Sequence, residues 1–244
     1  MSAPDHDPDS TPERPDLAAP LPAAARPGGY SLVLNFLPLL WVLAGALLLW
    51  RAGDTGERVV LGLFWVYLLP PALGRLAMAL WGAPVGDALD QSARAYKVWW
   101  LLMQLQLPFN RVPVFEELLR LVPGLYALWL NAWGARVSPV VFWGPGALVV
   151  DRHAVRVGPG AVIGTRAVLT GHLAVQDAAG RFTVTLAPVT VGAAALIGAY
   201  AGIGPGCVVA AGQEVPAARF LRPHTRWDQG RRVKALPGAA GRAG

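Results

Sequence analysis

Two long runs of apolar residues occupy the first third of the chain. Residues 30–50 contain no charged side chain, and residues 59–81 contain a single one, Arg75. The 21 residues of the first run would extend roughly 30 Å as a helix, which is the thickness of the hydrocarbon core of a bilayer. The pattern predicts a transmembrane helical hairpin over residues 30–83. We expect Arg75 to lie close enough to the end of the second helix to reach the interface.

The next segment, residues 84–135, is apolar without forming a clean span. Polar and charged side chains interrupt its apolar runs, among them Gln104, Gln106, Asn110, Glu116, Glu117 and Arg120. Eight of the ten tryptophans lie between Trp41 and Trp133, and such amphipathic rings gather at the headgroup level of membranes. We therefore predict interfacial amphipathic helices. Buried helices of a soluble domain are an open alternative, and so is a short span over residues 118–133.

Aliphatic residues recur at every sixth position in the C-terminal half. The positions are Val157, Ile163, Leu169, Val191, Ile197, Ile203, Val209, Val215 and Leu221, and a weaker run at Val137, Trp143 and Val149 has the same step displaced by two residues. A period of six fits neither a helix nor a simple strand. It predicts a coil of three short parallel strands, with 18 residues per turn and the aliphatic side chains inside. The 22 residues from Leu169 to Val191 exceed one coil, so most of residues 173–188 must leave it as a loop.

Composition and charge narrow the class of protein. Apolar residues make up 54% of the chain and charged residues 15%, with a mean hydropathy of +0.42, which excludes an ordinary soluble enzyme. Residues 1–29 carry a net charge of −3 and predict a disordered acidic tail, whereas residues 134–244 carry +8 and end in a basic flexible tail from residue 228. No basic helix, zinc-ligand spacing or RNA-binding motif accompanies the positive charge, so we do not expect nucleic acid as a partner.

The hexad region resembles a known family of enzymes. The stretch of residues 155–164, the Leu-Thr-Gly-His sequence ending at His172, and residues 188–206 resemble the core of the hexapeptide-repeat acyltransferases of the maltose and nodulation type. The resemblance covers about ninety residues and implies a left-handed parallel β-helix over residues 136–227. With the apolar hairpin it suggests the membrane-tethered bacterial members, a membrane-anchored fold of helical hairpin, interfacial helices and all-β solenoid. It also implies a homotrimer.

The resemblance implies a specific reaction. An acyl group, with acetyl as the expected one, would pass from acyl-CoA to a hydroxyl or amine of a glycan or lipid-linked acceptor, without a covalent enzyme intermediate. His172 matches the general base of the family. Asp151 stands where relatives often carry an acidic residue near the acceptor, and a purely structural role for it is equally open. We expect His153 to be a solvated turn residue rather than an orienting partner of His172.

The donor would bind in a groove between coils of neighbouring subunits. The residues that match the family's groove motif are Gly198, Ala199, Gly204 and Gly206. Arg222 belongs to a group of basic side chains that would bind the phosphates of the coenzyme A nucleotide. The family's usual glycine-asparagine-proline-alanine ending is absent, and residues 222–225 read Arg-Pro-His-Thr instead. We expect no metal. Two alternatives remain, a metal hydratase resembling the γ-type carbonic anhydrases and a catalytically silent membrane scaffold.

The distribution of basic residues around the hairpin predicts its orientation. Arg75, Arg94, Lys97 and Arg111 follow the second run, whereas the loop between the two runs contains two arginines. By the positive-inside rule, both termini and the β-helix face the cytoplasm of a bacterial cell, with the hairpin in the cytoplasmic membrane. Acyl-CoA is cytoplasmic, which agrees with this orientation. The sequence leaves open the acceptor, the acyl length, the pathway and the choice between O- and N-transfer.

Overall fold

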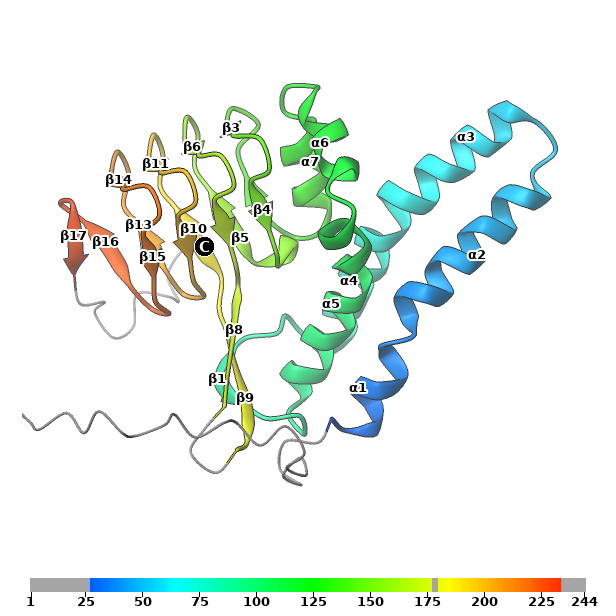
Figure 1. Cartoon of the computed structure of the whole chain (residues 1–244), viewed down its shortest axis with the longest axis horizontal. Coiled ribbons are helices and arrows are strands. Elements are labelled where there is room, and N and C mark those ends of the chain that lie inside the picture. Colours follow the sequence, from blue (N-terminus) through cyan, green and yellow to red (C-terminus); the bar gives the residue numbers. More distant parts are fainter. Residues whose placement is uncertain (1–26, 177–179, 234–244) are drawn as a thin grey trace, which may run out of the picture.

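The computed structural model describes residues 27–176 and 180–233, and it has two parts (Figure 1). A helical hairpin projects from a layer of shorter helices, and this layer packs against the first coil of a solenoid of short strands. The first helices are α1 (Gly29–Leu34), α2 (Leu37–Arg51), α3 (Thr55–Leu63), a π-helical turn (Phe64–Leu68) and α4 (Leu69–Trp81). The two apolar runs therefore form a helical hairpin as predicted.

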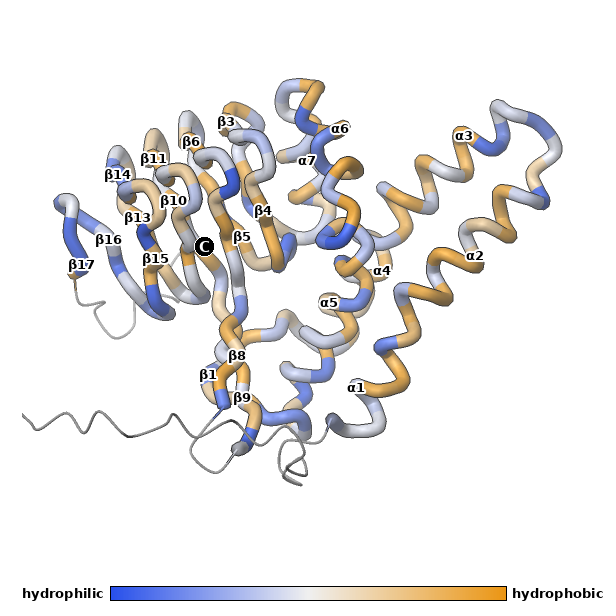
Figure 2. Tube along the Cα trace, viewed as in Figure 1, coloured by the Kyte–Doolittle hydropathy of each residue, from blue (hydrophilic) through white to orange (hydrophobic). Residues whose placement is uncertain are grey.

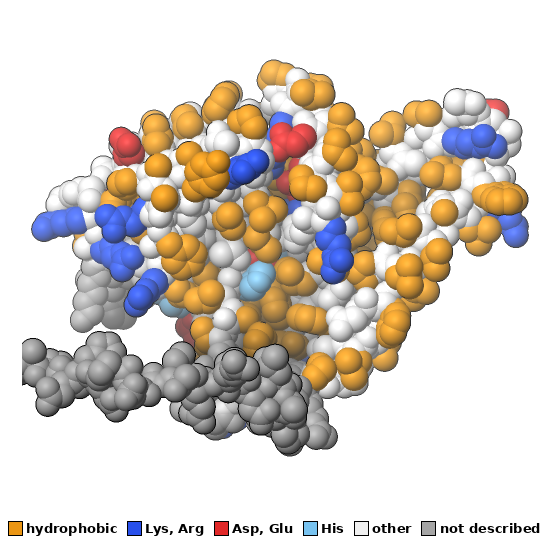
Figure 3. All heavy atoms as spheres, in the orientation of Figure 1, with side chains coloured by type: hydrophobic (Ala, Val, Ile, Leu, Met, Phe, Trp, Pro, Cys, Tyr) orange, Lys and Arg blue, Asp and Glu red, His pale blue; other side chains and the backbone are white. Residues whose placement is uncertain are grey.

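Apolar residues follow one another along the hairpin (Figure 2), and their side chains lie on its surface instead of in a core (Figure 3). In α2, Leu40 and Leu47 are each 57% exposed and Trp50 is 84% exposed. Residues 29–51 and 55–81, of 23 and 27 residues, form helices long and apolar enough to cross a membrane. Burial inside the protein does not account for this apolar surface, and its insertion in a bilayer stays a prediction.

The proline pair in the second helix leaves a carbonyl that another helix satisfies. Pro71 has no N–H, so it cannot donate the usual helical hydrogen bond to the carbonyl of Tyr67. The indole Nε1 of Trp129 donates to this carbonyl instead, at 2.9 Å. The hydroxyl of Tyr67 in turn donates to the carbonyl oxygen of Phe115, at 3.0 Å. The hairpin is thus attached to the helix layer at the point where its own hydrogen-bond ladder is interrupted.

The helix layer follows a short strand. Its elements are β1 (Gly86–Leu89), α5 (Arg94–Arg111), α6 (Val114–Arg120) and α7 (Leu125–Ala132). Trp99, Trp129 and Trp133 are at most 5% exposed. The expectation that the tryptophans of this segment lie at headgroup depth is wrong for these three, because their rings pack inside the protein, Trp129 and Trp133 in the core shared with the β-helix. They follow the alternative of buried helices.

The outer side of the same helices remains apolar. Leu118, Leu121 and Leu128 are 51%, 76% and 62% exposed. A helix layer with one face in the core and one apolar face outside is compatible with contact to a membrane surface. The prediction that residues 84–135 lie at the membrane interface therefore now applies only to this outer face of the helices.

The C-terminal half is the three-sided parallel β-helix that the hexad repeat predicts (Figure 1). The strands of the first two coils are β2 (Arg136–Val137), β3 (Phe142–Trp143), β4 (Leu148–Val149), β5 (Val155–Val157), β6 (Val162–Ile163) and β7 (Val168–Leu169). The next two coils contain β10 (Val189–Val191), β11 (Leu196–Ile197), β12 (Gly202–Ile203), β13 (Val208–Val209), β14 (Glu214–Val215) and β15 (Phe220–Leu221). Ile163 lies opposite Ile197, and both are fully buried in the core. The predicted inward positions are confirmed.

The coil departs from its regular register twice. Strand pairing joins residues 20 apart between the first two coils, as Val137 to Val157, but 18 apart later, as Val191 to Val209. The two additional residues are accommodated between β4 and β5, where the chain forms the three-residue 3₁₀ turn Arg152–Ala154. The second departure is an antiparallel hairpin of β8 (His172–Gln176) and β9 (Phe182–Leu186), to which β1 adds on the side of β9. The predicted excursion is confirmed, in the form of strands.

The last coil is closed by a second hairpin. Strand β16 (Arg226–Asp228) continues a ladder of the coil, and β17 (Arg231–Val233) returns antiparallel to it. Trp227 is 3% exposed, covers the end of the core and donates from Nε1 to the carbonyl of Glu214 at 2.8 Å. The flexible tail expected from residue 228 is therefore wrong for residues 228–233. Residues 234–244 and most of the expected acidic tail, residues 1–26, lie outside the described residues.

Candidate active site

The two departures from register meet, and they bring His172 and Asp151 together. Asp151 directly precedes the 3₁₀ turn after β4, and His172 opens β8. The coils stack in this region, with the amide of Val150 donating to the carbonyl of Leu169 at 2.9 Å. The Nδ1 atom of His172 lies 2.7 Å from Oδ2 of Asp151. Each irregularity of the repeat therefore contributes one member of a histidine–carboxylate pair.

Asp151 is held firmly in place. Its side chain is 1% exposed, and its carboxylate accepts hydrogen bonds from the amide of Gly171 at 2.8 Å and from Nε1 of Trp99 at 3.2 Å. Burial raises the pKa of Asp151, but the hydrogen bond and charge of His172, the charge of His153 and the Gly171 amide outweigh it, so the pKa is lowered from its ordinary value. The carboxylate is therefore ionised at neutral pH.

The ring of His172 is partly accessible. Its side chain is 19% exposed, and the ring rests against the indole of Trp99, with centroids 5.0 Å apart. Because Nδ1 faces the carboxylate, the neutral ring places its proton on Nδ1 and its lone pair on Nε2. An imidazole held in this tautomer is suited to accept a proton at Nε2.

His153 is not the solvated turn residue that we expected. It lies within the 3₁₀ turn, is half-buried, and its Nδ1 has no hydrogen-bond partner in the described part of the chain. Burial lowers the pKa of His153; the charge of Asp151 opposes this shift, and that of His172 adds to it. The ring therefore lies in the electrostatic field of the pair without bonding to it.

One face of α5 supports the turn that carries Asp151. Trp99 binds the carboxylate itself, and Oε1 of Gln106 accepts the backbone N–H of Arg152 at 2.7 Å. Asn110 accepts from Nη2 of Arg152 at 2.9 Å. The three helical residues are spaced seven and four apart, which places them on one face. Sequence reasoning treated Gln106 and Asn110 as interruptions of an amphipathic pattern; their spacing relative to Trp99 was the signal that could have identified this face.

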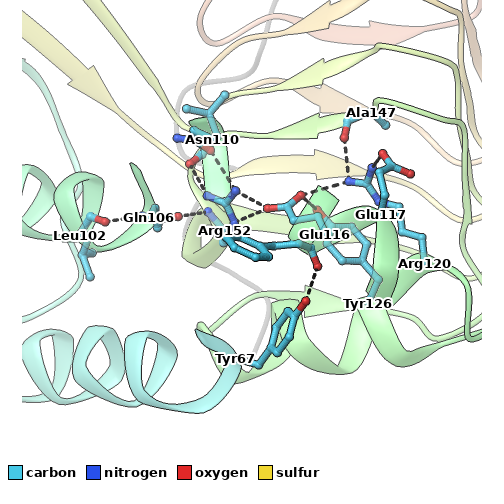
Figure 4. Close-up of polar contacts among 12 residues, drawn as sticks. Tyr67, Leu102, Gln106, Asn110, Glu116, Glu117, Arg120, Tyr126, Ala147 and Arg152 are labelled. Atoms are coloured by element: carbon cyan, nitrogen blue, oxygen red, sulfur yellow. Dashed lines mark hydrogen bonds and ion pairs between the residues drawn. The ribbon is translucent and has the colours of Figure 1, made fainter. Parts of the chain in front are cut away.

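A buried ionic network extends this support (Figure 4). Arg152 is fully buried and donates from Nε to Oε1 of Glu116 at 2.6 Å. The other oxygen of Glu116 accepts from the hydroxyl of Tyr126 at 2.7 Å and from Nη2 of Arg120 at 3.2 Å. Burial, followed by the charge of Glu116, raises the pKa of Tyr126, which keeps the phenol a hydrogen-bond donor. The network joins α6 and α7 to the residue that follows Asp151, and no pattern along the sequence indicates it.

The residues expected to bind the donor fall on two different edges of the coil. Gly204 follows β12 and Arg222 follows β15, on the edge of the coil where the chain leaves β7 at Thr170. The coils are in contact there, because the Thr170 amide donates to the carbonyl oxygen of Ile203 at 3.0 Å. Gly198 follows β11, on the next edge. The structure therefore brings Gly204, Gly206 and Arg222 to the edge that carries His172, whereas Gly198 and Ala199 lie apart from it.

Coil geometry alone explains the buried glycines at these positions. A Cβ added to Gly204 would lie 2.8 Å from the carbonyl oxygen of Leu221, and one added to Gly198 would lie 2.7 Å from Cα of Ala217. Arginines gather on the last coils nearby (Figure 3), where Arg219, Arg222, Arg231 and Arg232 are exposed.

A metal site like that of the γ-type carbonic anhydrases would need a third histidine besides His153 and His172. The remaining histidine of the β-helix, His224, has a different partner. His224 pairs through Nε2 with Oδ1 of Asp87 in β1, at 2.7 Å. Within residues 27–176 and 180–233, no three histidine, cysteine or carboxylate side chains form a group that could hold a metal ion.

Comparisons with known proteins find similarity to solved acetyltransferase structures. No protein-family model matches the sequence, and no curated protein matches it. A serine acetyltransferase from Neisseria gonorrhoeae is 15% identical over 85% of this chain and 95% of its own, with a TM-score of 0.28. A maltose O-acetyltransferase from Clostridium difficile 630 is 13% identical over 53% of this chain and 88% of its own, and a galactoside acetyltransferase in complex with coenzyme A is 14% identical over 53% and 82%, each with a TM-score of 0.24. At these TM-scores and identities the similarity assigns neither a family nor a function, and the argument for the site rests on the geometry of this chain.

Proposed function

We propose that the protein is an acyl-CoA-dependent acyltransferase and that His172 is its general base. The observation that carries the proposal is the pairing of His172 Nδ1 with the buried carboxylate of Asp151, at the position where the hexad coil is interrupted. The repeat resembles that of acyltransferases with a histidine at this point, which supports acyl-CoA as the donor.

In the proposed reaction, the hydroxyl or amine of the acceptor attacks the thioester carbonyl while Nε2 of His172 takes its proton. The tetrahedral intermediate expels the thiolate of coenzyme A, which receives the proton from Nε2. The products are an acyl ester or amide and free coenzyme A. Asp151 holds the productive tautomer and stabilises the imidazolium that forms between the two steps, because its charge lies 2.7 Å from Nδ1.

The proposal includes a membrane location. The exposed apolar hairpin supports an anchor in the bacterial cytoplasmic membrane, with the β-helix in the cytoplasm where acyl-CoA is available. This location favours a glycan or lipid-linked acceptor. A cysteine introduced at Gly53, between the two helices, should react with a membrane-impermeant reagent from outside the cell, and protection there would contradict the orientation.

The proposal also includes a homotrimer. Gly198 and Ala199 lie on a different edge from His172, so a donor groove that uses all the expected residues needs two subunits side by side. Arg222 and the neighbouring exposed arginines would take the nucleotide phosphates. Sedimentation in detergent should give a trimer, whereas a monomer at micromolar concentration would count against the shared groove.

The direct test of the activity uses labelled donor. Purified protein in detergent is incubated with acetyl-CoA labelled in the acetyl group and with a lipid and glycan extract of bacterial membranes. We expect label in an acceptor together with an equal amount of free thiol, and neither product with the His172→Ala variant. Release of label by mild alkali would identify an ester, and resistance would identify an amide. Thiol release that is no faster than without protein, or that is unchanged in the variant, would contradict the proposal.

A further inference from the structure

A cavity of about 450 Å³ lies where the second helix of the hairpin meets the first two coils. Its wall is partly apolar, with Met78 and Ala79 from α4 and Val85 from the segment that follows. Three arginines also line it, Arg75 from α4, Arg136 from β2 and Arg156 from β5. Among residues 27–176 and 180–233, no acidic side chain lines it.

Two of these arginines are neighbours in a strand ladder. Arg136 and Arg156 are direct partners in the parallel pairing of β2 with β5, so their side chains leave the same face of the sheet about 4.8 Å apart. Like charges in such a position repel each other unless an anion lies between them. Within the described residues, neither guanidinium forms an ion pair, and neither does that of Arg75.

Arg75 is the only charge in the second half of an otherwise apolar helix that could span a membrane. Its Nη1 lies 3.2 Å from the position that a Cβ on Gly134 would take, so the side chain reaches across to the start of the β-helix. A charged group within an apolar span is unfavourable and usually has a functional partner. Its direction brings it to the wall that also contains Arg136.

We propose that this cavity binds a phosphate-bearing group, held by Arg75, Arg136 and Arg156. A phosphate monoester carries a charge of about −1.5 to −2 at neutral pH and three acceptor oxygens, which suits three guanidinium groups better than a single carboxylate does. The apolar wall from α4 fits the hydrocarbon part of an amphiphile that enters from the membrane side. The ligand class is therefore an anionic phosphate compound, either a lipid headgroup or a soluble phosphate.

The position of the cavity connects it with the proposed reaction. His153 and Ala154 line the cavity, and both belong to the short 3₁₀ turn that directly follows Asp151. We therefore place the hydroxyl or amine that accepts the acyl group on the phosphate-bearing molecule bound at the arginines. The role as acceptor rests on the proposed function, whereas binding of the phosphate does not.

The test measures binding without any acyl transfer. The full chain in zwitterionic detergent is titrated with inorganic phosphate and pyrophosphate in one arm, and with micelle-embedded phosphatidic acid against phosphatidylcholine in the other. Hydrogen exchange of the unmodified protein provides the first readout, and we expect protection of residues 134–136 and 153–156. Protection by phosphatidic acid alone identifies a lipid headgroup, and protection by the inorganic anions identifies a soluble phosphate.

Variants provide the second readout. Arg136→Gln and Arg156→Gln should each weaken binding about tenfold, the effect of removing one charge-assisted contact. Arg166→Gln removes an equal charge from an exposed turn of the same β-helix outside the cavity, and it should leave binding nearly unchanged. Absence of protection in both arms, or equal weakening by Arg166→Gln, would overturn the proposal. Phosphate binding that persists in a protein without acyl-transfer activity would refute the proposed function and leave the site intact.

Discussion

One prediction about folding stability concerns Glu116, the centre of the buried ionic network. Glu116→Gln preserves the shape of the side chain and removes its charge. Arg152, which is fully buried, then loses its only ion-pair partner in the described part of the chain, and Arg120 loses one of two. The amide nitrogen of the new glutamine also faces hydrogen-bond donors, either those of Arg152 or those of Tyr126 and Arg120, and it cannot accept from them. Removing one partner of a buried ion pair typically costs about 3–5 kcal/mol, so we expect a loss of that size in the free energy of unfolding.

Glu117→Gln is the matched control. It makes the same chemical change one residue along the same helix, but the side chain of Glu117 is 38% exposed, and its partner Arg120, whose side chain is 7% exposed, keeps its second ion pair with Glu116. Because water reaches the Glu117 carboxylate and Arg120 keeps its ion pair with Glu116, this variant should lose less stability than Glu116→Gln, about 1 kcal/mol. Unfolding by urea in detergent, followed by tryptophan fluorescence, measures both. Equal stability of the two variants, or a loss below about 1 kcal/mol for Glu116→Gln, would refute the claim that the network holds the helix layer to the coil.

Three further changes test other parts of the structure. Trp129→Phe leaves the Tyr67 carbonyl without its donor and should lower the free energy of unfolding by about 1–3 kcal/mol, measured by the same denaturation; no change would mean that this contact is replaced. Because the pKa of His153 is lowered from 6.5, the unfolded chain takes up a proton that the folded one does not as the pH falls below that value, so stability declines there. His153→Leu should flatten the stability–pH curve in this window, and an unchanged slope would contradict the assignment. Gly198→Ala places a methyl group against the backbone of Ala217 and should destabilise by roughly 1–3 kcal/mol in thermal unfolding, whereas a neutral effect would show that the coils can separate locally.

The sequence predicted the β-helix and its interruption well, because the hexad repeat is a local pattern in which each aliphatic residue reports one strand. The two-residue displacement after Val149 was also visible, but its consequence was not. Only the stacking of coils shows that the additional residues place Asp151 directly under His172. A pattern read along the chain cannot show which two irregularities face each other.

The helix layer was predicted less well, and the reason is physical. Tryptophans at a membrane interface and tryptophans in a protein core give the same apolar pattern with occasional polar breaks. Their difference lies in the partner surface, and in this protein the first coil supplies that surface to Trp129 and Trp133. The burial of Arg152 could not be predicted either, because it depends on Glu116 and Asn110, which lie 36 and 42 positions away.

The central claim is that His172 acts as the general base of an acyl transfer, and the turnover of His172→Ala tests it most directly. The substitution removes a partly exposed ring and no core aliphatic side chain, so the fold should survive. In steady-state acyl transfer, loss of a general base should lower kcat by roughly 10²–10⁴-fold with the affinity for coenzyme A little changed, while His153→Ala should have a much smaller effect. Full activity in a well-folded His172→Ala protein would contradict the account.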